Sequence, residues 1–113
     1  YSLEGKIMGT YQLYQAYWQM AGISCAMPWQ DLLPQAAVSQ VRLQGELSAA
    51  QIKQLVHLVY DVRRDDARFR LGYQDAASFD WMRKHYPERR EWSSLRVQGS
   101  SDPRLTALGF TVI

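Results

Sequence analysis

The sequence has little of several features that would mark a particular class of protein. It contains one cysteine, Cys25, so no disulfide can form within the chain and a disulfide-stapled scaffold is excluded. Two histidines accompany that cysteine without any short metal-ligand spacing, and we expect neither a metal nor another cofactor. Glycines never gather into a phosphate-binding loop with a lysine, and no serine lies in a G-x-S-x-G elbow. The sequence therefore predicts no catalytic activity.

Charge is scarce in the first half of the chain. Residues 1–54 carry six charged side chains, and none lies between Lys6 and Asp31. The uncharged stretch contains glutamines, glycines and a proline, which excludes a membrane span and a signal peptide. Without an export signal or disulfides, we expect a cytoplasmic protein with no membrane partner. The net charge of +2 is too small to indicate a nucleic-acid-binding protein by itself.

The composition that is present is that of one ordinary globular domain. The 113 residues are 47% hydrophobic and 21% charged, close to the average of soluble proteins. A chain of this length forms one domain, which we assign to residues 1–113. The chain begins at Tyr1 rather than Met, so we treat residues 1–9 as disordered or vector-derived and assign them no function.

Hydrophobic spacing and capping residues predict a mainly α fold. A helix is expected from Thr10 to about Ala21. A central, most buried helix is expected from about Ala49 to Arg63, begun by a capping box at Ser48. The other expected elements are a short turn at Trp29–Leu33, a helix from Asp75 to about Tyr86, a short helix that begins at Asp102–Pro103 and ends at Gly109, and an extended Phe110–Ile113.

Two five-residue segments repeat one pattern, V-R-L-Q-G at 41–45 and L-R-V-Q-G at 95–99. This alternation with a final glycine is typical of a short strand that enters a turn, and such segments would pair with each other. Ala36 and Ala37 favour a helix instead, so whether residues 38–44 and 94–98 are strands is left open. The predicted fold is a compact bundle of four to five short helices, with a small two- or three-strand ribbon as an α+β variant.

The first expected helix carries two apolar faces. One, assigned to the core, consists of Leu13, Ala16, Tyr17 and Met20. The other consists of Tyr11, Tyr14 and Trp18, and its neighbours are uncharged. Large aromatic rings are typical anchors of protein interfaces, so we expect this second face to bind a protein partner or a second copy. The alternative, that Phe110–Ile113 folds over it as ordinary core, stays open.

Basic residues in the second half of the chain indicate a different partner. The segment Gly72–Phe79, which runs into Arg83-Lys84-His85, resembles the last helix–turn–helix of AraC-type regulators. The resemblance implies a helix–turn–helix around residues 63–90 that contacts DNA phosphates. The residues expected to make these contacts are Arg63, Arg64, Arg68, Arg70, Arg83 and Lys84. The acidic side chains of the same half indicate an ion-paired surface instead.

These features lead to two functional hypotheses, neither of them enzymatic. The first is a small, non-catalytic interaction or regulatory protein that acts through its aromatic surface as a homodimer. The alternative is a DNA-binding regulator that uses residues 63–90.

Overall fold

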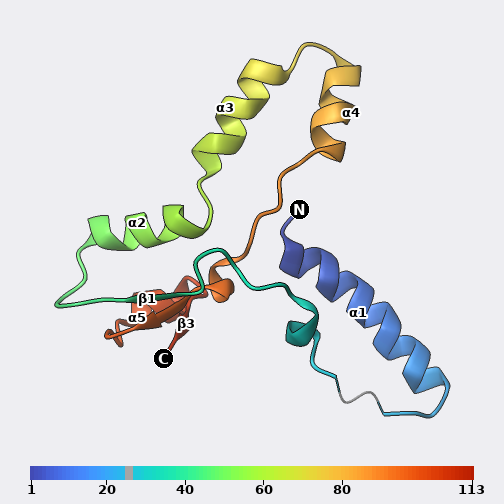
Figure 1. Ribbon diagram of the computed structural model, residues 1–113, viewed down its shortest axis with the longest axis horizontal. Coiled ribbons are helices and arrows are strands. Elements are labelled where there is room, and N and C mark those ends of the chain that lie inside the picture. Colours follow the sequence, from blue (N-terminus) through green and yellow to red (C-terminus); the bar gives the residue numbers. More distant parts are fainter. Residues whose placement is uncertain (25–26) are drawn as a thin grey trace.

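Figure 1 shows the computed structural model of the chain, which describes residues 1–24 and 27–113. Cys25 lies outside the described residues. In chain order the elements are α1 (Leu3–Met20), η1 (Trp29–Leu32), β1 (Gln40–Arg42), α2 (Ala49–Val59), α3 (Val62–Gly72), α4 (Ala76–Lys84), η2 (Trp92–Ser94), β2 (Arg96–Gln98), α5 (Pro103–Ala107) and β3 (Thr111–Val112), where η marks a 3-10 helix. The predicted mainly α class with a small three-stranded sheet is confirmed. Among the described helices, none has the length and apolar character needed to cross a membrane.

The three strands form one parallel sheet with β2 in its centre. Val41 of β1 lies opposite Val97 of β2, which lies opposite Val112 of β3. β1 and β2 come from the two repeated segments, so the prediction that these segments pair is confirmed. The strands are offset by two residues from the alignment of the repeats, and an even offset keeps the apolar positions on the same face of the sheet. Phe110–Ile113 thus joins the sheet and does not cover the first helix.

The hydrophobic core lies where this sheet meets α2 and α5. Leu95, Val97 and Leu105 are fully buried, and Leu55 and Phe110 complete the cluster. The partly buried residues packed around it are Val41, Leu43, Leu47, Val56, Val59, Trp92 and Val112. The core is therefore small, and four of its five buried residues come after residue 94.

Three of the four predicted helix starts are confirmed by hydrogen bonds. Ser48 and Gln51 form the expected capping box, and Asp75 and Ser78 form a second one. Asp102 accepts a hydrogen bond from the amide of Arg104 at the start of α5. Capping side chains satisfy amides that have no partner inside the helix, which is why they mark helix starts reliably.

The expected end of the central helix is wrong. α2 ends at Val59 rather than Arg63, because Tyr60 is extended and Asp61 caps a new helix. The Asp61 carboxylate accepts a hydrogen bond from the amide of Arg63. The stretch from 49 to 72 is therefore two helices joined by a two-residue bend.

The first helix starts earlier than Thr10. α1 begins at Leu3, where the Ser2 hydroxyl accepts a hydrogen bond from the amide of Gly5 at 3.1 Å. The amide of Leu3 donates to the carbonyl of Arg89 at 2.9 Å. Our expectation of disorder within residues 1–9 is therefore wrong for residues 3–9.

The core face that we assigned to α1 is wrong, and the other face is buried only in part, since Tyr14 is 37% exposed. Leu13, Tyr17 and Met20 of the expected core face are 75%, 66% and 89% exposed. Tyr11 of the other face is buried, and its hydroxyl donates to the carbonyl of Met27 at 2.5 Å. The reason is that the chain after α1 turns back, so that η1 contacts the helix.

The described chain has an open shape. Its radius of gyration is 17.8 Å, whereas a compact domain of this length has about 13 Å. Figure 1 shows α1 on one side and the α3–α4 pair on another, both extending away from the sheet. The helices are thus more spread out than the compact bundle that we expected. A fold this open leaves large apolar side chains on its surface.

The end of β2 gives a test of the sheet. Gly99 has φ +90°, and a Cβ there would lie 2.3 Å from the carbonyl oxygen of Leu43. We expect Gly99→Ala to lower the free energy of unfolding by more than about 3 kcal/mol, since strain and a backbone clash add. Gly45→Ala is the matched control, because Gly45 has φ +79° with open space around it. It should cost about 1 kcal/mol in urea denaturation. Equal losses in the two variants would contradict this packing of β1 on β2.

Candidate functional site

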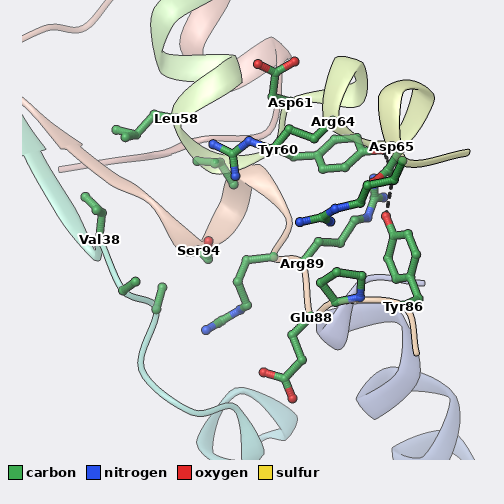
Figure 2. A pocket seen from close by; sticks show the side chains of 16 residues that line it. Val38, Leu58, Tyr60, Asp61, Arg64, Asp65, Tyr86, Glu88, Arg89 and Ser94 are labelled. Atoms are coloured by element: carbon green, nitrogen blue, oxygen red, sulfur yellow. Dashed lines mark hydrogen bonds between the residues drawn. The ribbon is translucent and has the colours of Figure 1, made fainter. Parts of the chain in front are cut away.

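A cavity lies between α2, α3 and the chain segment that follows α4. It has a volume of about 260 Å³. Its walls come from residues 36–38, from the end of α2, from the first half of α3 and from residues 86–90 (Figure 2). We call it the α3 pocket. Because four separate segments contribute, only the folded chain can form it.

A carboxylate that accepts two tyrosine hydroxyls lies on the wall of the α3 pocket. Tyr60 and Tyr86 both donate to Oδ2 of Asp65, the latter at 2.5 Å, as the dashed lines in Figure 2 show. Burial raises the pKa of Tyr86 above its ordinary value, and the hydrogen bond to Asp65 adds to the effect. These bonds fix α3 against both the end of α2 and the segment after α4.

Arg89 forms the part of the wall next to this carboxylate. Its guanidinium lies over the ring of Tyr60, 4.0 Å from the ring centre, and donates to Glu91 at 3.2 Å. The Nε of Arg89 is buried, and no described residue accepts a hydrogen bond from it. A buried donor without a partner costs about 1–3 kcal/mol, so this atom would gain from a ligand oxygen.

The four arginines of α3 divide into two kinds. The two outside the pocket lining are ion-paired, Arg63 with Asp61 at 2.6 Å and Arg70 with Asp66 at 2.9 Å. The hydrogen bond from Arg63 also lowers the pKa of Asp61. The two that line the pocket, Arg64 and Arg68, have no ion pair or side-chain hydrogen bond with any described residue.

The residues predicted to contact DNA do not form one free basic surface. α3 and α4 are joined by a short turn at residues 73–75 and contact each other. Arg83 and Lys84 both pair with Asp80, at 2.9 and 2.6 Å. Four of the six predicted residues are thus ion-paired, and only Arg64 and Arg68 remain.

The predicted protein-binding residues lie on α1, apart from the lining of the α3 pocket. Tyr11 is buried, while Tyr14 and Trp18 lie edge to face at a ring distance of 5.8 Å. The Nε1 of Trp18 is buried without a hydrogen-bond partner among the described residues. Whether these three residues bind a protein stays a prediction.

Metal and nucleophile chemistry has little to build on in residues 1–24 and 27–113. No group of three or more histidine, cysteine, aspartate or glutamate side chains there could hold a metal ion. Cys25 is not among these residues, so the expected lack of a metal stays a prediction.

No sequence pattern singled out the residues that form the α3 pocket. The acidic side chains of this half of the chain, Asp65 among them, were expected only on an ion-paired surface. One readable signal was the i, i+4 spacing of Arg64 and Arg68, which places both on one helix face. Nothing in the sequence indicated that Tyr86 and Arg89 would lie against that face.

Comparisons with known proteins give the chain a context. A family model described as "Domain of unknown function (DUF3410)" matches residues 32–109. The erythronate-4-phosphate dehydrogenase of Aeromonas salmonicida is 54% identical over 113 residues, which cover 99% of this chain. The proteins of that name from Yersinia enterocolitica and Tolumonas auensis are 50% and 48% identical, over 98% and 99% of the chain. The chain spans about 30% of the length of these relatives.

These similarities correct our functional hypotheses. The relatives are named as dehydrogenases, which contradicts a standalone, non-catalytic regulatory protein and the prediction of no enzyme. A DNA-binding regulator is contradicted for the same reason. Whether residues 1–9 are vector-derived stays a prediction.

The tyrosine–carboxylate contact predicts how stability changes at high pH. The pKa of Tyr86 is raised above its ordinary value of 10.0, so the unfolded chain loses this proton before the folded chain does. Stability from this group is therefore present below about pH 10 and is lost as the pH rises further. We expect Tyr86→Phe to remove this alkaline loss and to cost about 1–2 kcal/mol at neutral pH.

The measurement is the free energy of unfolding by urea at neutral pH and at about pH 11. Tyr73→Phe is the control, since Tyr73 is exposed. The same alkaline loss in wild type and Tyr86→Phe would show that Tyr86 is not the group responsible.

Proposed function

This chain belongs to the DUF3410 family, and from that premise we propose that it is a segment of an erythronate-4-phosphate dehydrogenase. The identity of 54% over almost the whole chain carries the proposal. The reaction implied by that name is oxidation of a phosphorylated hydroxy acid, in which a hydride passes to an acceptor such as a nicotinamide cofactor. A charged phosphate ester stays inside the cell that makes it, which fits the cytoplasmic location that we expected.

We further propose that this segment serves the enzyme by packing against other protein surfaces, including a second copy. The open shape described above supports this role, because a domain with so small a core leaves apolar area to be covered. Met20 on α1 is 89% exposed and Leu71 on α3 is 87% exposed. The exposure of such apolar side chains to water is unfavourable in free energy, and burial against another protein surface removes this cost.

Two groups of exposed apolar residues could make such contacts. On α1 they are Leu13, Tyr17 and Met20, which are all more than half exposed. Near the α3–α4 turn, Phe69 stacks on Tyr73 at a ring distance of 5.1 Å and meets Phe79 at 6.5 Å. Exposed aromatic clusters of this kind are typical of protein interfaces.

The activity can be tested on the full-length protein that carries this segment. We expect it to oxidise erythronate 4-phosphate. The reaction is measured by the absorbance of the reduced nicotinamide cofactor that it produces. Erythronate without its phosphate is the control substrate and should give a far lower kcat/KM. No turnover of the phosphorylated substrate with any nicotinamide acceptor would contradict the proposed function.

A pair of double variants tests the contact face of α1. Leu13→Ser with Met20→Ser should leave the full-length protein folded and reduce its molar mass in light scattering, because both residues are exposed. Tyr14→Ser with Trp18→Ser tests the face that the sequence predicted. If the second pair alone yields a folded species of lower mass, the predicted Tyr11, Tyr14 and Trp18 face is the interface. If neither pair changes the mass, self-association through α1 is refuted.

A further inference from the structure

We propose that the α3 pocket binds a phosphate group, carried by inorganic phosphate or by a small phosphate monoester. This goes beyond the proposed dehydrogenase activity, because it assigns a ligand to a site within this segment. The first observation is the pair of arginines that line the pocket and have no partner among the described residues, Arg64 and Arg68.

The four arginines of α3 differ in their partners, although Arg64 and Arg68 are both exposed side chains. Arg63 and Arg70 lie on the same helix and have acidic partners within 2.9 Å. Arg64 and Arg68 are spaced i, i+4, which places their guanidinium groups on one face of α3. Two positive charges on one helix face repel each other, so an anion that binds both is favoured.

The acids near the pocket neutralise this charge only in part. Asp61 is ion-paired with Arg63, while Asp65 accepts both tyrosine hydroxyls and keeps its one negative charge against the two arginines. Figure 2 shows the carboxylate of Glu88 pointing away from the pocket side on which Arg64 lies. The pocket therefore keeps an excess of positive charge from α3.

A third arginine lines the same pocket. The Nε of Arg89 is buried without a hydrogen-bond acceptor among the described residues, and Arg89 lines the pocket. Its stack on Tyr60 holds the guanidinium in place, so little side-chain freedom is lost on binding.

The donors and the volume favour phosphate over other anions. Guanidinium groups bind the tetrahedral oxygens of phosphate through paired hydrogen bonds, and three arginines can share its three or four oxygens. A cavity of about 260 Å³ has room for a phosphate with a short carbon chain and is too small for a nucleic acid strand.

The experiment measures phosphate binding to the full-length protein by equilibrium dialysis, at constant ionic strength set with sodium chloride. One arm uses inorganic phosphate and the other uses erythronate 4-phosphate, so that the two sources are distinguished. The test variant is Arg64→Gln with Arg68→Gln. The matched control is Arg63→Gln with Arg70→Gln, which removes the same charge from the same helix. Circular dichroism checks that both variants remain folded.

We expect the wild type and the control to bind one more phosphate per chain than the test variant, or to bind that phosphate on the order of 100-fold more tightly. Binding of both ligands at this site would assign it to phosphate groups in general, and binding of inorganic phosphate alone would assign it to the free ion. The proposal is overturned if the test variant binds phosphate with the same stoichiometry and affinity as the control variant. It is also overturned if the control variant loses as much phosphate binding, relative to wild type, as the test variant does. The dialysis experiment measures binding and not turnover. It therefore tests the phosphate site even if the full-length protein has no dehydrogenase activity.

Discussion

The buried carboxylate of Glu4 holds together three segments that are far apart in the sequence. It accepts hydrogen bonds from Nε of Arg90 at 2.8 Å and from the amide of Glu91 at 3.0 Å. Arg90 in turn donates to the carbonyl of Pro34 at 2.6 Å. Removing one partner of a buried ion pair leaves the other charge uncompensated, at a cost of about 3–5 kcal/mol. The position of α1 and of the chain before β1 therefore depends on this one contact.

The same stretch of chain continues into the α3 pocket. Tyr86 and Arg89 come just before the residues that bind Glu4. Tyr86 holds α3 through Asp65, and Arg89 contacts the ring of Tyr60, the residue that follows α2. One extended segment without regular secondary structure thus positions helices on both of its sides. This explains how so open a molecule can keep a defined shape with a core of only a few fully buried residues.

Sequence reasoning succeeded where a signal is local. Ser48 and Asp75 cap helices through bonds to residues three positions away, so the sequence contains both partners. It failed at α1, since both faces of that helix are apolar and only the return of residues 27–33 decides which face is buried. The α3 pocket was out of reach for a similar reason: Arg64 meets Tyr86 and Arg89 only after the chain has turned at α4. The relation to dehydrogenases came from similarity to whole proteins, which composition and spacing do not contain.

The parallel sheet has a consequence for the order of folding. β1 and β2 are joined by residues that include three helices, and paired residues such as Arg42 and Gln98 are 56 positions apart. Parallel strands with so long a connection close late, because a large loop must be ordered before any ladder bond forms. The capped helices α2 and α4 need no such closure and can form while the chain is still being synthesised. Until β2 arrives, β1 has an unpaired edge and the apolar face of α2 is uncovered, so the nascent chain passes through a stage at which it is prone to aggregate.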